Sequence, residues 1–217
     1  MYELVDSETI SKHIQRSHGH MDTYARIMAD LARTIHAIEV SENDDFPDAS
    51  ERLLEYVEGG VALEDVALGK KCRKLIEALP RTNTLLHGDF HTNNVFMQKG
   101  EPLMIDMDRI SRGHPIAEIS DLYYFYVVLG EDDPSVVEKF MGFSYPTAKR
   151  FFDLFLRRYL DTDDEDRLRE VTEKASLLCY TRMMRKQRVL SANDNAIAER
   201  CRERIAKLTE RLDTLAF

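Results

Sequence analysis

The sequence predicts an α+β fold that is mainly helical, in which a helical bundle carries one small β-ribbon. Apolar residues recur at three- and four-residue spacing over most of the 217-residue chain, as they do along amphipathic helices. Short apolar runs separated by polar turn residues occur only in the middle of the chain. A chain of this length can bury a hydrophobic core as one globular domain or as two small ones.

The helices are predicted from this spacing and from residues that end helices. Apolar positions from Met21 to Ile38 lie on one face of a long helix, and Pro80 ends a helix that runs through residues 68–79. An apolar stretch after Pro115 predicts a buried helix, and two or three amphipathic helices follow it. The predicted helices cover residues 21–38, 53–57, 68–79, 119–127, 148–160, 168–190 and 196–212.

Three short apolar runs predict strands at residues 84–86, 95–97 and 103–105. The polar tetrapeptide Gln-Lys-Gly-Glu at residues 98–101 joins the second run to the third and is typical of a turn. We therefore expect a small hairpin or ribbon inside a helical protein.

The charge of the chain excludes one class of partner. It has 30 Lys and Arg residues against 39 Asp and Glu residues, a net charge of −9. The first 162 residues contain 18 basic and 28 acidic residues, a net of −10, and the remaining 12 basic and 11 acidic residues give +1. Because phosphate backbones attract positive charge, we expect no nucleic-acid partner.

Cysteine usage and hydropathy predict a cytoplasmic protein. Cys72, Cys179 and Cys201 are scattered and odd in number, which favours reduced thiols over a disulfide framework. The first residues lack the apolar run of a signal peptide, and the longest apolar stretch, at residues 122–130, is too short to span a bilayer. We therefore also expect no membrane partner.

The polar residues between the predicted strands have the spacing of a catalytic loop. Residues 87–94 read His-Gly-Asp-Phe-His-Thr-Asn-Asn, and Ile-Asp-Met-Asp follows at residues 105–108. In kinases, the Asp of a His-x-Asp-x-x-x-x-Asn loop orients and deprotonates a hydroxyl, the Asn binds magnesium, and a second carboxylate after a strand also holds the metal. Magnesium prefers hard oxygen ligands and takes few of them from protein. The alternative is that these side chains only cap helices and turns.

These motifs resemble those of the aminoglycoside phosphotransferase/choline kinase family, which has the protein-kinase-like fold. The loop and the Ile-Asp-x-Asp strand end are followed by a Gly-x-Pro-x-x-Glu segment at residues 113–118. The resemblance extends from Met1 to about Val128, and residues 2–5, Tyr-Glu-Leu-Val, resemble the hinge between the two kinase lobes. The helices after Val128 fit the family more loosely. The resemblance implies the large C-terminal lobe of this fold.

The resemblance implies a role for each residue of the loop. Asp89 is the expected base, and Asn94 and Asp106 are the expected magnesium ligands. His87 is expected to buttress the loop, and His91 to pack within it rather than react.

Supporting and nucleotide-binding positions follow from the same resemblance. Asp108 is expected to support the metal or the substrate, and Glu118 to brace the catalytic segment from a buried position. Asp121, one turn later, is expected on a helix surface or as a helix cap. The implied cofactors are Mg²⁺ and ATP, the latter as co-substrate. The residues expected to contact the nucleotide are Glu3, Val5, Phe96 and Ile105.

By this resemblance, residues 1–217 form a single kinase-like C-terminal lobe. Residues 1–6 are a hinge remnant, 7–82 form helices, 83–108 hold the catalytic loop and the metal-binding ribbon, and 115–217 form a helical subdomain. The family's small N-terminal lobe covers the ATP phosphates with a loop and a strand Lys. We expect no counterpart of this lobe in the chain, because no Gly-x-Gly occurs and the lysines before His87 lie in helical patterns. We therefore expect weak or absent ATP binding.

Three hypotheses about function stay open. The chain is a fragment of an ATP-dependent small-molecule kinase, or a non-catalytic binding or regulatory module built on a kinase lobe, or half of a site that a second polypeptide completes. In the second case, a partner or a second copy of the chain would cover the exposed hinge. The intact catalytic residues favour the first, in which the γ-phosphoryl group of ATP passes to a hydroxyl of a small molecule.

The distribution of charged residues bears on the charge of the small molecule that accepts the phosphoryl group. The acidic excess of the first 162 residues is compatible with a cationic acceptor. A basic stripe on the predicted helix at residues 168–190 is expected to be a solvated face. The stripe consists of Arg182, Arg185, Lys186 and Arg188.

Overall fold

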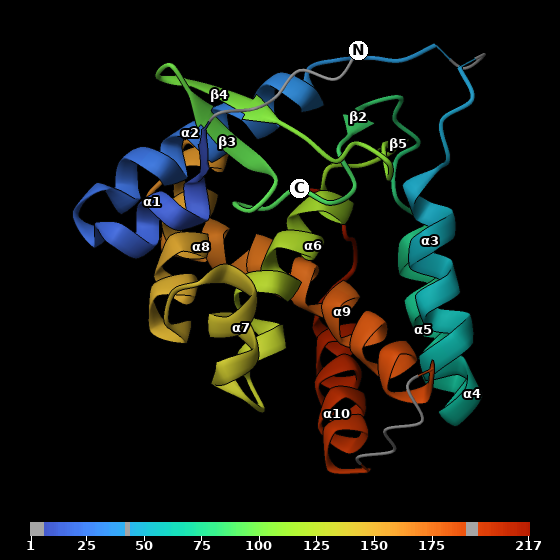
Figure 1. The fold of residues 1–217 in the computed structure, drawn as a ribbon. Helices are drawn as coiled ribbons and strands as arrows, with labels where there is room; N and C mark the ends of the chain where they lie inside the picture. The colour runs from blue at the N-terminus through green and yellow to red at the C-terminus, as the bar shows by residue number, and fades with distance from the viewer. Residues whose placement is uncertain (1–6, 42–43, 190–194) are drawn as a thin grey trace.

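The computed structural model describes residues 7–41, 44–189 and 195–217, and within them the predicted fold class is confirmed (Figure 1). Most of these residues are helical, and the strands are short. Among them, no helix combines the length and the apolar character that crossing a bilayer requires. The α-helices are α1 (Ile10–Arg16), α2 (Met21–His36), α3 (Ala49–Tyr56), α4 (Ala62–Glu64), α5 (Val66–Glu77), α6 (Ile116–Tyr126), α7 (Pro134–Met141), α8 (Tyr145–Leu160), α9 (Glu165–Val189) and α10 (Asn195–Arg211).

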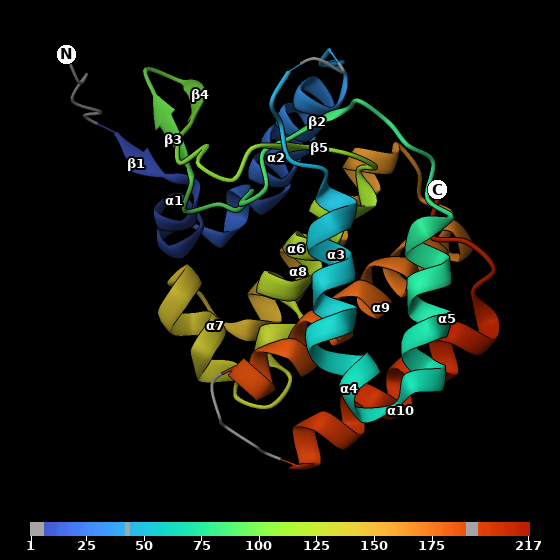
Figure 2. The same cartoon turned by 90° about the vertical axis from the view of Figure 1, so that its right-hand side faces the viewer.

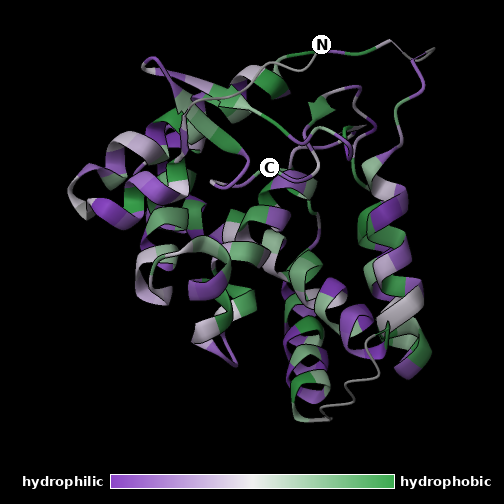
Figure 3. Ribbon diagram, viewed as in Figure 1, coloured by the Kyte–Doolittle hydropathy of each residue, from purple (hydrophilic) through white to green (hydrophobic). Residues whose placement is uncertain are grey.

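The helices bury one contiguous hydrophobic core. Helix α9 packs against both α6 and α10, and α2 packs against α8. Helices α3 and α5 lie side by side (Figure 2). Most helices show one hydrophobic and one hydrophilic face (Figure 3), and the apolar faces meet in the core. Helix α6 is buried along nearly its whole length, which agrees with its continuously apolar sequence.

A three-stranded antiparallel sheet lies at one end of the molecule (Figure 2). Its order is β1 (Glu8–Thr9), β3 (Val95–Gln98) and β4 (Glu101–Met104). Strands β3 and β4 form the predicted hairpin. Lys99 and Gly100 at its tip have φ values of 53° and 86°, the left-handed conformation in which a two-residue turn matches the twist of its strands.

The structure differs from the predicted strands and helices in several places. Strand β2 (Leu85–Leu86) does not join the ribbon but pairs antiparallel with β5 (Ser111–Arg112). Residues 7–82 are not helical throughout, because β1 extends the hairpin into a sheet. Sequence reasoning missed α1 and α7, and the predicted hinge remnant at residues 1–6 lies outside the described residues. Three further short helices are η1 (His18–His20), the π-helical η2 (Val57–Val61) and η3 (Val128–Gly130).

A buried hydroxyl network fastens the segment between β2 and β3 to two helices. Thr92 Oγ1 lies 2.7 Å from Ser11 Oγ of α1 and accepts a hydrogen bond from Tyr126 OH of α6 at 2.9 Å. The Thr92 N–H also donates to Tyr126 OH, at 3.0 Å. Because polar groups at such depth need partners, this network specifies one position for the segment.

Thr92→Val keeps the shape of the side chain and deprives the hydroxyls of Ser11 and Tyr126 of this partner. We expect the free energy of unfolding to fall by about 1–3 kcal/mol, the usual cost of a buried polar group without a partner. Urea unfolding followed by circular dichroism measures the change. Thr23→Val, on the exposed face of α2, is the control and should change the free energy by less than about 0.5 kcal/mol. Equal effects of the two substitutions would contradict this role of the network.

Candidate functional site

The predicted catalytic loop begins with a glycine that other residues cannot replace without strain. Gly88 has a φ of 81°, and a Cβ atom there would lie 2.0 Å from the carbonyl oxygen of Arg109. Both the left-handed backbone and the close approach require glycine. The chain after β2 therefore runs directly against the segment that follows Asp106, which brings the two halves of the predicted site together.

His87 fixes the spacing at this crossing. Its Nε2 lies 3.0 Å from the carbonyl oxygen of Ile105, and the Asp89 N–H points at its Nδ1 with a separation of 3.3 Å. Since Nδ1 accepts, the proton is on Nε2, which donates to Ile105. The side chain is fully buried, so these bonds join the loop to the end of β4 without competition from water.

A buried carboxylate anchors the loop to the helices. Glu118 of α6 accepts the Gly88 N–H through Oε1 at 2.8 Å, and its Oε2 lies 2.9 Å from His36 Nε2 of α2. His36 Nδ1 lies 2.7 Å from the hydroxyl of Tyr159 in α8. The Glu118 side chain has no exposed area, so these hydrogen bonds compensate for its burial. Three helices are thereby joined to the loop.

Asp89, Asn94 and Asp106 line one open cavity of about 460 Å³, which we call the loop cavity. Asn94 donates from Nδ2 to the carbonyl oxygen of Asp89 at 3.0 Å, which leaves its side-chain oxygen as the available ligand atom. Asp106 has a φ of 61°, a conformation that is uncommon for residues other than glycine and is concentrated at functional sites. The structure thus brings the three predicted active residues together.

The oxygen atoms of this cavity fit magnesium. Two carboxylates and one amide oxygen face the same space, and all are hard ligands. In the part of the chain that the structure describes, no group of three or more His, Cys, Asp or Glu side chains is placed to hold a metal alone. Magnesium usually takes one or two protein carboxylates and completes its shell with phosphate and water. Two ligands such as Asn94 and Asp106 would therefore be sufficient protein ligands for Mg²⁺ and would leave Asp89 free.

His91 packs between Asp89 and two aromatic rings. Its Nε2 lies 3.7 Å from Asp89 Oδ1, and its ring meets Phe125 and Phe140 edge-on, each at 5.1 Å between centroids. Burial lowers the pKa of His91 to about 4, against the opposing effect of the Asp89 charge. The imidazole is therefore neutral near pH 7.

Asp108 lies apart from the loop cavity. It is exposed and lines a separate cavity of about 270 Å³ beside the start of α3. Asp108 is thus not among the residues that line the loop cavity, and its expected support of the metal or the substrate stays a prediction.

The expected nucleotide-binding residues are only partly described. Phe96 and Ile105 are half-buried, and the Ile105 N–H donates to the carbonyl oxygen of Asn94 at 3.0 Å, beside the expected metal ligands. Glu3 and Val5 lie outside the described residues.

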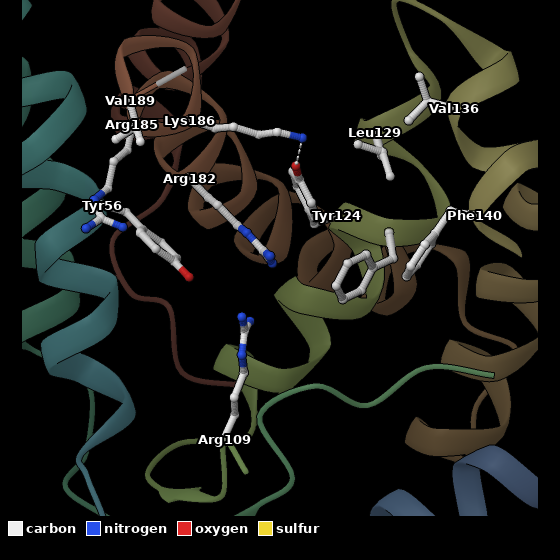
Figure 4. Close-up of a pocket in the computed structure, with 11 residues that line it drawn as sticks. Tyr56, Arg109, Tyr124, Leu129, Val136, Phe140, Arg182, Arg185, Lys186 and Val189 are labelled. Carbon is white, nitrogen blue, oxygen red and sulfur yellow. Dashed lines mark hydrogen bonds between the residues drawn. The ribbon is translucent and has the colours of Figure 1, made fainter. Parts of the chain in front are cut away.

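A second cavity, which sequence reasoning missed, adjoins the loop cavity. It measures about 550 Å³ and is lined from α3, α6, α7 and α9 (Figure 4). We call it the basic cavity, after its lining residues Arg109, Arg182, Arg185 and Lys186. Arg109 and Arg182 line both cavities, as do Phe125 and Phe140. The signal that could have found it was the basic stripe of α9.

Two interpretations of charged residues were wrong. Asp121 is not on a helix surface but is 4% exposed, and it pairs with Arg52 at 2.9 Å and Arg182 at 2.7 Å. Burial raises the pKa of Asp121, while the two arginines act in the opposite direction. Arg182 is accordingly not on a solvated face, and its guanidinium lies 4.0 Å from the centroid of the Tyr124 ring. A buried carboxylate partner allows this basic residue to face inward.

Comparison with known proteins adds a decisive observation. The sequence model described as the phosphotransferase enzyme family matches residues 2–171, which is more than half of the chain. The chain belongs to this family. A search of curated proteins found no match to this phosphotransferase-family chain.

Solved structures share the fold of this phosphotransferase-family chain at low sequence identity. A choline/ethanolamine kinase family protein from Mesorhizobium loti is 14% identical, aligns over 97% of this chain and 68% of its own, and has a TM-score of 0.57. An amicoumacin kinase in complex with AMP-PNP, Ca²⁺ and Ami is 18% identical, aligns over 99% of this chain and 65% of its own, and has a TM-score of 0.58. The ADP-bound aminoglycoside phosphotransferase APH(2'')-Ib is 14% identical, aligns over 100% of this chain and 72% of its own, and has a TM-score of 0.51. The chain thus spans 65–72% of the length of these structures.

The buried imidazole of His91 should make the stability depend on pH. Its pKa in the folded protein, about 4, lies below the ordinary value of 6.5, so the unfolded state binds more protons as the pH falls below 6.5. We expect the unfolding free energy to fall by about 2 kcal/mol between pH 7.5 and pH 5, because each pH unit below 6.5 costs up to about 1.4 kcal/mol.

His91→Gln should remove this part of the pH dependence, as measured by urea unfolding at several pH values. His20→Gln, which removes an exposed imidazole, serves as the control. A His91→Gln protein whose stability falls with acid as steeply as that of the control would contradict the burial argument.

Proposed function

We propose that this chain carries the acceptor-activating and metal-binding part of an ATP-dependent phosphotransferase, which transfers the γ-phosphoryl group to a hydroxyl of a small molecule. The observation that carries the proposal is the meeting of Asp89, Asn94 and Asp106 on one cavity. His87 and Glu118 hold this arrangement through buried hydrogen bonds. The family to which the chain belongs supports the class of reaction.

In this proposal, the carboxylate of Asp89 accepts the proton of the acceptor hydroxyl as its oxygen attacks the γ-phosphorus and ADP leaves. The side-chain oxygens of Asn94 and Asp106 would hold Mg²⁺, which would supply positive charge to the phosphate oxygens. Neutral His91 lies against Asp89 without cancelling its charge. His87 acts as a buttress and Glu118 as a brace, because neither lines the loop cavity.

The remaining parts of the site belong to the same proposal. Phe96 and Ile105, beside the metal ligands, are proposed to contact the nucleotide, together with Glu3 and Val5. A cytoplasmic location, where ATP is supplied, also remains a prediction.

Metal binding tests the proposal on the chain itself. Mn²⁺ replaces Mg²⁺ as a probe, and electron paramagnetic resonance measures its binding in the presence of AMP-PNP. We expect Asp106→Asn to weaken this binding at least about tenfold, because it removes a charged ligand. Asp163→Asn, at a position whose side chain is 95% exposed, is the matched control and should leave binding unchanged. Equal binding by the two variants would contradict the proposal.

Phosphoryl transfer tests the role of Asp89. With a hydroxyl compound that the protein phosphorylates, Asp89→Asn should lower the transfer rate by about 10²-fold or more, because the general base is lost. Binding of Mn²⁺ with AMP-PNP should stay within about threefold of the unaltered protein, because the metal ligands remain. ADP release measures the rate. Transfer at the original rate would contradict the assignment of Asp89 as the base.

A further inference from the structure

The basic cavity is placed to hold the molecule that receives the phosphoryl group. It adjoins the loop cavity, because Arg109 and Arg182 line both, and the stacked rings of Phe125 and Phe140 also line both. Its volume of about 550 Å³ lies within the range of small-molecule sites. A molecule that extends from the basic cavity past these shared residues would enter the loop cavity, which Asp89 lines.

The charge of this lining is entirely positive. Four cationic side chains line the basic cavity, and no Asp or Glu side chain does so. Arg182 is paired with Asp121, and Arg185 lies 3.5 Å from the mostly exposed Glu55. Within the described residues, no carboxylate lies at ion-pair distance from Arg109 or Lys186, although Arg109 shares the loop cavity with Asp89 and Asp106.

Two glycines let the backbone of η2 pack closely against Arg185. At Gly60 in η2, a Cβ atom would lie 2.8 Å from the backbone nitrogen of Arg185, and at Gly59 it would lie 3.2 Å from Arg185 Nε. The two glycines let η2 approach α9 closely. Residues 57–61 form a π-helical turn, a feature frequent at functional sites. This approach places Arg185 between η2 and the basic cavity.

Hydrogen-bond donors converge on the open middle of the basic cavity. The guanidinium groups of Arg109 and Arg182 and the hydroxyl of Tyr56 point toward the same space (Figure 4). Burial raises the pKa of Tyr56, so its phenol stays protonated and can donate. Lys186 Nζ lies 3.0 Å from Tyr124 OH at the edge of this space. Guanidinium and ammonium groups arranged in this way suit an anion.

The rest of the lining is aromatic and aliphatic. The rings of Tyr124, Phe125 and Phe140 line the basic cavity together with aliphatic side chains from η3, α7 and α9. The Phe125 and Phe140 rings are stacked at 5.3 Å. Such surfaces favour a planar or apolar body beside the charged group.

We propose that the basic cavity binds the phosphoryl acceptor and that this acceptor is a hydroxy acid, a small molecule with a carboxylate and an apolar or aromatic body. The carboxylate pairs with Arg109, Lys186 adds positive charge at the edge of the cavity beside Tyr124, and the hydroxyl faces Asp89. This inference rests on the proposed function. It replaces the cationic acceptor that the acidic composition suggested, because the charge beside the loop cavity has the opposite sign to the net charge of the chain.

Three probes that differ mainly in charge test the inference. 3-Phenyllactate carries a carboxylate, 3-phenylpropane-1,2-diol is neutral and phenylalaninol is cationic, and each has a hydroxyl and a phenyl ring. Their affinities for the full chain are measured by NMR titration without nucleotide or metal. We expect phenyllactate to bind at least tenfold more tightly than the diol, and phenylalaninol to bind most weakly. Equal affinities, a preference for phenylalaninol or no binding by any probe would overturn the inference.

Matched variants assign the selectivity to the basic cavity. Lys186→Gln and Arg109→Gln should each weaken phenyllactate binding about tenfold and leave the diol unaffected, whereas Lys186→Arg should retain binding. Lys207→Gln, on an exposed position of α10, is the control and should change nothing. If Lys186→Gln and Arg109→Gln both bind phenyllactate as the control does, the inference is overturned.

The probe titration and the metal titration distinguish a failure of this inference from a failure of the proposed function. Lost charge selectivity with intact Mn²⁺ binding overturns the acceptor class alone. Retained selectivity with equal Mn²⁺ binding by Asp106→Asn and Asp163→Asn overturns the proposed reaction and leaves an anion-binding cavity.

Discussion

The hydrogen bond from the Gly88 amide to Glu118 joins the catalytic segment to the helical core at a point with no exposed area. A carboxylate at such depth is stable only while its hydrogen bonds are made, and breaking one of them leaves a costly unpaired group. The same side chain contacts His36, which contacts Tyr159. Any displacement of the loop would therefore disturb α2, α6 and α8 together. The positions of the cavity-lining residues that follow in the loop depend on this attachment.

The sign of the charge that lines the basic cavity, next to this loop, differs from the sign of the net charge of the chain. The chain carries −9 overall, yet the basic cavity is lined by cations alone among its charged residues. Buried Asp121 makes this possible, because it pairs with Arg52 and Arg182 and so permits arginine to face the interior of the fold. The acidic residues that dominate the composition lie elsewhere, as Glu55 does at the rim, with 65% of its side chain exposed. The cationic acceptor that composition suggested therefore differs in sign from the acceptor that this lining favours.

Features that depend on neighbouring residues could be predicted, and features that depend on distant segments could not. The apolar spacing of α2 and the turn at Lys99 and Gly100 are local patterns, and the structure contains both. The loop spacing likewise placed Asp89, Asn94 and Asp106 in one group. Pairing of β2 with β5 and the basic cavity instead depend on segments far apart in the chain, for which a single sequence has no pattern. Helix α7 had local signals, since Asp133 caps it and Gly142 ends it with a φ of 80°, but these were overlooked beside its short apolar pattern.

The central claim is that the predicted catalytic loop, residues 87–94, is part of the rigid core before any ligand binds. Native-state hydrogen exchange of the Gly88 amide tests this claim most directly, with the Leu122 amide in buried helix α6 as the internal reference. The account predicts that both amides exchange only on global unfolding, with the same opening free energy. Exchange of the Gly88 amide through a local opening, at a free energy well below that of Leu122, would show that Glu118 does not hold the loop and would contradict the account.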